Sequence, residues 1–348
     1  MSDLGFSIAA LKRLFSVFSW NRVAPTDFVI SQYLDFYGLR FRASIRHFLG
    51  YADLGLYQFA VQAWFPEAPI GTLFVVHGYF DHVGLYRHVI DWALNRRLVV
   101  VAFDLPGHGL SSGKMVSIPD FSHYQNVLAG VMALAKSQVP EPWYAVGQST
   151  GAGVLLDQLL HQAPRSAPGS LLQSVPSDTS ASMFALPWKR VALLAPLIRA
   201  ASWGAVRISW HLLHRFQDRV PRNFGFNSHD QNFMNFLQYE DPLQSRFVSA
   251  TWVGAMIRWS RRVEAAPCSA FSPLVVQGDA DTTVDFDFNL PLLSQKFTEP
   301  TIIKLPKARH HLVNESASFR AELFHALGVH MLGDACAINT ERGSEVCP

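Results

Sequence analysis

The chain is poor in cysteine, and its cysteines follow no familiar pattern. Cys268, Cys336 and Cys347 are an odd number, and none belongs to a Cys-x-x-Cys spacing. A disulfide framework and a metal site are therefore not expected, and the cysteine usage fits a reducing, cytoplasmic location. The alternative, a bridge between Cys336 and Cys347, is disfavoured because disulfides are rare in such compartments.

Charged residues are also scarce. They make up 16% of the 348 residues, and the formal net charge is only +2. A protein that binds nucleic acid would show a concentrated basic face, so no nucleic-acid partner is expected. Hydrophobic residues make up 49% of the chain. That share argues against a disordered protein. The length of 348 residues is enough for one large core with an inserted piece, or for two domains.

Long uninterrupted apolar runs are absent as well. No stretch approaches the roughly 18 apolar residues of a membrane-spanning helix. A secretory signal is not expected either, because Asp3 stands where positive charge belongs. The N-terminus instead predicts an amphipathic helix, which docks on the protein's own surface or, as the alternative, makes peripheral contact with a membrane. The apolar positions of this helix are Leu4, Ile8, Leu11, Phe15 and Phe18.

Short apolar segments alternate with longer helical patterns over most of the chain. This order is typical of βαβ units, and continuous apolar composition is expected of strands buried on both faces of a parallel sheet. An earlier segment, Tyr57–Phe65, is predicted to pair antiparallel at the edge. The predicted parallel strands are Thr72–His77, Leu98–Asp104, Trp143–Gly147, Arg190–Ala195, Leu274–Gly278 and Thr301–Leu305, and the predicted helices are about Leu85–Asn95, Pro119–Ser137, Thr150–His161 and Asn314–Leu327.

Two segments interrupt this alternation. Ala163–Pro187 is rich in Ser, Pro and Ala, which predicts a surface loop. Pro196–Val263 holds no good strand but many aromatic residues, which indicates a helical cap inserted between two strands. The chain thus divides into an N-terminal extension with the amphipathic helix (1–50), a first part of the core (51–195), the cap (196–263), a second part of the core (264–330) and a C-terminal tail (331–348).

A Gly-x-Ser-x-Gly motif at residues 147–151 follows an apolar strand and opens an apolar helical stretch. In that setting the motif predicts a nucleophile elbow, a sharp turn that exposes the oxygen of Ser149 above the sheet. Glycines at 147, 151 and 153 would let the helix and the strand approach closely. The alternative is an ordinary tight turn, and we favour the catalytic interpretation because the chain supplies the other parts of such a site.

An elbow serine needs two donors that stabilise the negative oxygen of a tetrahedral intermediate. One is expected to be the backbone N–H of Thr150, the residue after the nucleophile. The other is expected from the loop after an earlier strand, where the N–H of Tyr79 follows a His-Gly pair. His77 in that pair is expected to order the loop rather than to react.

The serine also needs a base and a carboxylate that orients the base, in the chain order Ser, Asp, His. The acidic loop after the strand Leu274–Gly278 offers Asp279, Asp281 and Asp285, and the loop after the last strand offers His310 and His311. Spacing alone does not choose among these residues.

Three stretches resemble the monoacylglycerol lipase and bacterial lysophospholipase group of α/β-hydrolases, which is related to the serine aminopeptidases of the S33 type. In that group the acid is the second Asp of a Gly-x-x-Asp loop, and the base follows an Ala-Arg or Ala-Tyr pair. The resemblance therefore implies Asp281 as the acid and His310 as the base. It covers about Gln58 to Leu327. The three stretches are His77-Gly78-Tyr79 with Tyr86-Arg87, FDLPGHGLSSG at 103–113 and ARHHLVNE at 308–315, and a fourth, 228–243, resembles the cap segment of the group.

The resemblance implies an α/β-hydrolase fold with an inserted helical cap and a serine hydrolase that cleaves carboxylic esters, of monoacylglycerol or lysophospholipid type, without a cofactor. The elbow departs from the group at Gln148 and Thr150, where His and Met are usual, which leaves the substrate preference open. One alternative is a serine aminopeptidase or amidase, with Glu240 and Asp241 holding the substrate amine. The other is a catalytically silent binding protein on the same fold.

Aromatic side chains in the cap are candidates for substrate contacts. Trp203, Val206, Trp210 and Leu213 share one helix face by spacing, as do Phe233, Phe236 and Leu237 further on. From these stripes we select Trp203, Trp210, Phe233 and Phe236 as residues that line a pocket for an acyl chain. The alternative is that the stripes only seal the cap onto the core. Five arginines in the same region could attract anionic lipid surfaces or form a solvated face: Arg199, Arg207, Arg215, Arg219 and Arg222.

The remaining polar candidates are assigned structural roles. Asp104 and His108 flank a Pro-Gly pair, which indicates a tight turn rather than a second catalytic pair. His82, His88 and His123 show no metal-ligand spacing and are expected on the surface or in loops.

Overall fold

The computed structural model describes residues 6–161 and 186–333. The expected loop at 163–187, except its last two residues, lies outside the described part of the chain. So do Leu4, most of the C-terminal tail and the two cysteines at 336 and 347. Within the described part, Cys268 is exposed and carries a free thiol.

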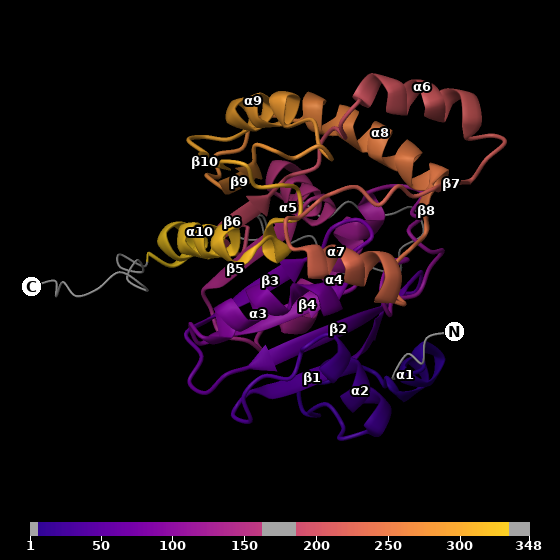
Figure 1. Cartoon of the computed structure of the whole chain (residues 1–348). Helices are drawn as coiled ribbons and strands as arrows, with labels where there is room; N and C mark the ends of the chain where they lie inside the picture. Colours follow the sequence, from indigo (N-terminus) through magenta and orange to yellow (C-terminus); the bar gives the residue numbers. More distant parts are fainter. Residues whose placement is uncertain (1–5, 162–185, 334–348) are drawn as a thin grey trace, which may run out of the picture.

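An eight-stranded sheet forms the centre of the molecule (Figure 1). The six predicted parallel strands are all present and pair parallel with one another, which confirms the α/β-hydrolase architecture expected from their apolar composition. Along the sheet the strands are β1 (Arg46–Asp53), β2 (Gln58–Phe65), β4 (Leu98–Phe103), β3 (Gly71–Val76), β5 (Trp143–Gln148), β6 (Trp188–Leu194), β9 (Leu274–Gly278) and β10 (Thr301–Leu305).

Helices cover both faces of the sheet. Successive residues of β4 belong to different apolar clusters: Val101 packs with the helices on one face and Val100 with those on the other. Because side chains alternate along a strand, this division means that both faces are buried. Helices α4 (Ser122–Ala135), α5 (Thr150–His161) and α9 (Phe286–Lys296) contribute to the first cluster, and α3 (Arg87–Leu94) and α10 (Ala317–Leu327) contribute to the second.

The sheet begins earlier in the chain than expected. The segment 57–65 forms β2, which is antiparallel as predicted, but its position at the edge was wrong, because β1 pairs with its outer side. Strand β1 crosses the boundary placed at residue 50, so the N-terminal extension supplies part of the sheet. A further unpredicted helix, α2 (Phe28–Phe36), precedes β1.

The amphipathic helix is present as α1 (Ile8–Leu14), and its apolar side faces the protein. Leu11 is fully buried, and Phe15 and Phe18 are nearly so. The segment that follows α1 pairs with β1 through hydrogen bonds between Tyr51 and both Ser16 and Phe18. In this structure α1 is therefore docked on the protein's own surface. Among the described residues, no helix has the length and apolar composition required to cross a membrane.

The helices of the cap are α6 (Trp203–Leu213), α7 (Gln231–Asn235), a π-helical turn, η3 (Phe236–Glu240), and α8 (Ala250–Ala265). Helices α6 and α8 lie at the end of the molecule opposite β1, and α7 lies between that end and β1 (Figure 1). The expectation that 196–263 holds no strand was wrong: β7 (Arg219–Pro221) and β8 (Phe247–Ser249) form a two-stranded antiparallel sheet. The short helical segments outside the cap are η1 (Val83–Tyr86), η4 (Leu312–Asn314) and η5 (Gly328–Leu332).

Candidate active site

Ser149 lies at the turn between β5 and α5. Its backbone has a φ of +55°, a conformation that is strained for a residue with a side chain and that marks a nucleophile elbow. Close packing makes the flanking glycines necessary. A Cβ on Gly147 would lie 2.5 Å from the backbone of Gly151, and one on Gly151 would lie 2.1 Å from the carbonyl oxygen of Val76. The turn that the motif predicted is therefore present.

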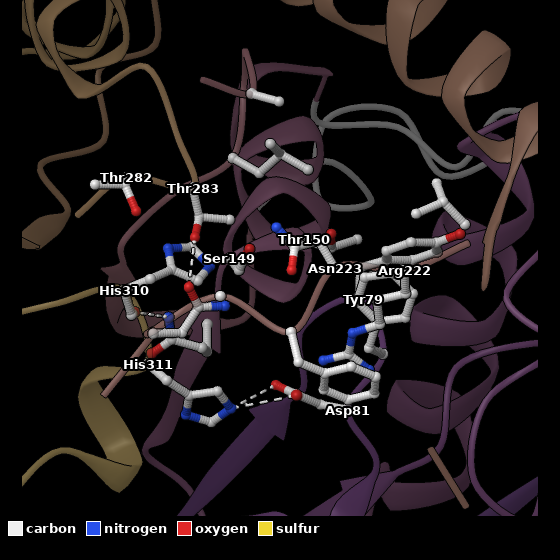
Figure 2. Close-up of a pocket in the computed structure, with 18 of the residues that line it drawn as sticks. Tyr79, Asp81, Ser149, Thr150, Arg222, Asn223, Thr282, Thr283, His310 and His311 are labelled. Atoms are coloured by element: carbon white, nitrogen blue, oxygen red, sulfur yellow. Dashed lines mark hydrogen bonds and ion pairs between the residues drawn. The ribbon is translucent and has the colours of Figure 1, made fainter. Parts of the chain in front are cut away.

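His310 and Asp281 form a buried pair next to this turn. Nδ1 of His310 lies 2.7 Å from Oδ2 of Asp281. The carboxylate also accepts hydrogen bonds from the Thr283 N–H, at 2.7 Å, and from Nε2 of Gln277, at 2.9 Å. The His310 ring and Ser149 border the same pocket (Figure 2). The structure therefore brings together the three residues that the sequence and the resemblance selected.

The pair shifts the pKa of both groups. Burial, which favours the neutral form of each group, is the largest single influence, but the opposite charge and the hydrogen bonds together outweigh it. Asp281 and its hydrogen bond raise the pKa of His310 above the usual 6.5. His310, together with the hydrogen bonds from Thr283 and Gln277, lowers the pKa of Asp281 below the usual 3.8. An orienting carboxylate thus stays ionised beside an imidazole that binds a proton more readily than a free one does.

The rival residues occupy other positions. Asp279 is exposed and accepts a hydrogen bond from the Lys307 N–H. Asp285 caps α9 through the Phe288 N–H, at 3.2 Å. Asp279 thus joins its loop to the loop of Lys307, Asp285 caps a helix, and neither carboxylate is the one bonded to His310.

His311 pairs with a different carboxylate in the same pocket. Its Nε2 lies 3.1 Å from Oδ2 of Asp81, which also accepts a hydrogen bond from the Tyr86 hydroxyl at 2.9 Å. Asp81 lies between the two parts of the first stretch that carries the resemblance, and the sequence predicted no role for it. Gln148, noted only as a departure from the group, donates a hydrogen bond from Nε2 to the His310 carbonyl at 2.8 Å.

The two expected oxyanion donors are free to bind a ligand. Within residues 6–161 and 186–333, neither the Tyr79 N–H nor the Thr150 N–H has a hydrogen-bond acceptor. The position of Tyr79 is fixed by its side chain. The ring stacks on Trp252 with 3.7 Å between centroids, and the hydroxyl donates to the Val116 carbonyl at 2.7 Å. Two unpaired backbone donors thus border the pocket that contains Ser149.

His77 and Asp104 order the loops around the site, as expected. Nε2 of His77 accepts a hydrogen bond from the Leu105 N–H at 2.8 Å. The Asp104 carboxylate accepts from the N–H groups of Val83 and Leu110, both at 2.8 Å. These bonds join the ends of β3 and β4. The loop that follows β3, residues 77–82, carries Tyr79 and is called the oxyanion loop below.

His82 lies in the loop between β3 and η1, which agrees with the expectation of a surface or loop position, but this part of the loop is not at the surface. His82 is fully buried, and its Nε2 lies 2.9 Å from Oδ2 of Asp241 in the cap. Asp241 also accepts hydrogen bonds from the Tyr37 hydroxyl at 2.7 Å and from Nε2 of Gln244 at 3.0 Å. This cluster, His82, Asp241, Tyr37 and Gln244, ties the oxyanion loop to both the cap and the N-terminal extension.

The pocket above Ser149 has a volume of about 440 Å³, within the range of small-molecule sites. None of the four aromatic residues selected from the cap lines it. Trp203 is buried in the core, and the indole N–H of Trp210 donates to the Ala250 carbonyl at 2.8 Å. Phe233 packs edge-on against His311, and Phe236 packs on Tyr37. The cap residues that line the pocket include Val206, Met234, Leu237, Val248, Val253 and Met256.

Comparisons with known proteins agree with this geometry. The family model described as serine aminopeptidase, S33, matches residues 67–317. The human monoglyceride lipase is 24% identical over 277 residues, which cover 76% of this chain and 84% of that protein. A monoacylglycerol lipase of Mycolicibacterium smegmatis is 31% identical over 115 residues, but these cover only 32% of this chain and 41% of that protein.

A solved structure gives the same fold. The crystal structure of a soluble variant of monoglyceride lipase from Saccharomyces cerevisiae, in complex with a substrate analogue, superposes with a TM-score of 0.64 at 15% identity. The superposition covers 80% of this chain and 92% of that one. Because the family model matches well over half of the chain, and the sheet and elbow agree with it, the chain belongs to the serine aminopeptidase S33 family of α/β-hydrolases.

Proposed function

We propose that the protein is a serine hydrolase that cleaves carboxylic esters with a single acyl chain. One observation carries the proposal: Ser149, strained at a φ of +55°, borders the same pocket as a His310 whose Nδ1 lies 2.7 Å from Asp281. Strain of this kind is maintained only where the surrounding structure imposes it, and it is common at catalytic positions.

The proposed reaction uses the pocket residues in turn. The Ser149 oxygen attacks the ester carbonyl while Nε2 of His310 accepts its proton, and Asp281 stabilises the imidazolium. The N–H groups of Tyr79 and Thr150 donate to the oxygen that becomes negative. The intermediate collapses, His310 protonates the departing alcohol, and an acyl-enzyme remains on Ser149. Water, deprotonated by His310, then releases the carboxylic acid.

An acyl chain is favoured by the lining of the pocket. Most of the cap residues that border it have apolar side chains, and these include Leu197 and Trp252. Burying apolar surface is favourable by about 0.8 kcal/mol for each methylene. The names of the related lipases point to monoacylglycerols as one such substrate.

An amide or peptide substrate is less well supported. Holding a substrate amine would require a free carboxylate near the cap, and Glu240 and Asp241 were the candidates. Glu240 is exposed and does not line the pocket, while Asp241 is buried and bonded to His82 and Tyr37.

We expect kcat/KM for p-nitrophenyl esters to rise with acyl-chain length, by a few hundredfold at most for four added methylenes at about 0.8 kcal/mol each. The series runs from acetyl to dodecanoyl, below micelle-forming concentrations. Val253→Phe, which fills the pocket from α8, should shorten the preferred chain. Ile208→Phe, on the exposed side of α6, is the matched control. If kcat/KM does not rise for acyl chains longer than butyryl, the pocket does not bind the acyl chain as proposed.

We also expect the activity to fall on the acid side with a midpoint above pH 6.5. His310 accepts the serine proton only when it is neutral, and Asp281 raises the pKa of this histidine above 6.5. The pH profile of kcat/KM reports that pKa in the free enzyme. In Asp281→Asn the residual activity should show a lower midpoint, whereas Asp279→Asn, at an exposed carboxylate, should leave it in place. A wild-type midpoint below 6.5 would contradict the assignment.

A further inference from the structure

Arg222 places a positive charge in the pocket, and the proposed reaction does not use it. This residue directly follows β7 in the cap, and its side chain borders the pocket together with Ser149 and His310. Figure 2 shows Ser149 between His310 on one side and Arg222 on the other. A substrate that is bound at Ser149 therefore has a guanidinium within the same cavity.

Neutral groups hold this guanidinium in place. It stacks over the Phe80 ring at 3.9 Å and over the Phe224 ring at 4.3 Å from the ring centroids. Its Nη1 donates to Oε1 of Gln244 at 2.6 Å and to the Ser245 carbonyl at 3.4 Å. Such contacts fix the orientation of the guanidinium plane without neutralising the positive charge of Arg222.

The charge has no ion-pair partner at contact distance. Among the described residues, no carboxylate lies within 4.0 Å of the Arg222 nitrogens, and its Nε and Nη2 have no hydrogen-bond acceptor. The nearby carboxylates, Asp81 and Asp241, are bonded to His311 and His82. Burial lowers the pKa of Arg222 to about 10, so the group remains charged at neutral pH.

A second arginine, Arg246, also lies near the Phe224 ring. The Arg246 guanidinium lies 5.1 Å from the centroid of Phe224, is exposed, and is close enough to Arg222 to lower its pKa. Two like charges around one ring repel each other in the empty site. An anion bound near Arg222 would relieve that repulsion and would supply the acceptor that its free N–H groups lack.

We propose that Arg222 binds an anionic group of the substrate, a phosphate or a carboxylate, and so makes the enzyme selective for anionic esters over neutral ones. This inference rests on the proposed ester hydrolysis. Guanidinium is suited to the role because its planar N–H groups can donate to two oxygens at once. The competing interpretation is that Arg222 only fastens the cap loop to Phe80, in which case its loss would affect all esters alike.

The test compares pairs of substrates in which one member carries an additional anionic group. The first pair is octanoyl glycerol phosphate and octanoyl glycerol, which places the anion on the alcohol. The second is the p-nitrophenyl half-ester of a dicarboxylic acid and the ester of the monocarboxylic acid of equal length, which places the anion on the acyl chain. Wild-type kcat/KM should be higher for the anionic member of at least one pair.

We expect Arg222→Met to lower the ratio of anionic to neutral kcat/KM about ten- to a hundredfold in that pair, because charge-assisted hydrogen bonds are lost while the packing on the two rings is kept. Arg222→Lys should lose less. Arg207→Met removes a charge from the exposed face of α6 and should preserve the ratio. The pair that responds identifies which part of the substrate carries the anion.

Two results would overturn the inference. One is a wild-type enzyme that prefers the neutral member of both pairs, an outcome that does not depend on whether any variant folds. The other is an equal loss for anionic and neutral substrates in Arg222→Met. In either case, hydrolysis of neutral esters that depends on Ser149 would still support the proposed function.

Discussion

Replacing Ser149 with alanine is expected to lower the chemical step by about a million-fold, to the level left by binding and the oxyanion donors. Alanine removes the attacking oxygen and leaves the rest of the pocket unchanged. It also keeps a Cβ at a φ of +55°, so the substitution does not relieve the strain of the turn. The loss should therefore appear in kcat without a comparable change in thermal stability.

Two measurements check this result. Ester hydrolysis is followed under single-turnover conditions, and a fluorophosphonate probe reports the nucleophile by covalent labelling. Wild-type protein should be labelled at Ser149 and the alanine variant should not. Ser209→Ala, at an exposed position of α6, serves as the matched control. Labelling that persists in Ser149→Ala would place the nucleophile elsewhere.

The second large effect is expected at His310. His310→Ala removes the group that takes the proton from Ser149, and the loss should be about ten-thousandfold or greater in kcat. His311→Ala should cost much less activity, because His311 pairs with Asp81 rather than with Asp281. It should reduce thermal stability instead, since it leaves the buried Asp81 carboxylate without one of its hydrogen-bond partners.

The carboxylate provides an independent check of the same triad. Asp281→Asn keeps the shape of the side chain but favours the wrong tautomer of His310, and a loss of about ten-thousandfold is expected. Asp279→Asn is the matched control on the same loop. Equal losses at the two histidines in folded protein, or at the two aspartates, would remove the assignment of base and acid.

Sequence reasoning succeeded where a single local pattern determines the structure. The six parallel strands are continuous apolar segments, and the elbow is a fixed motif between a strand and a helix. It failed where the pattern is short or interrupted. Strands β7 and β8 are three residues long, too few to show an alternation, and α9 contains Pro291. Strand β1 carries polar and charged residues because it lies at the edge of the sheet.

The site was predicted only in part for a related reason. The chain order of Ser149, an aspartate and a histidine followed from the fold, but the choice of Asp281 and His310 needed the resemblance. The periodicity of the cap helices predicted which residues share a face, and it contains no information about what that face covers. Trp210 therefore packs on α8, while Val206 on the same helix lines the pocket. Likewise, the burial of His82 depends on a partner, Asp241, that lies 159 residues away.

The hydrogen bond between Tyr37 and Asp241 spans 204 residues of chain. During synthesis on the ribosome, Tyr37 emerges long before its acceptor exists. The Tyr37 hydroxyl therefore cannot make this hydrogen bond until the cap has been translated as far as Asp241. Contacts between such distant segments are slow to form, because the loop that joins them must close first. The contact between the N-terminal extension and the cap thus forms only after the cap has been made, although the residues of the extension are the first to be synthesised.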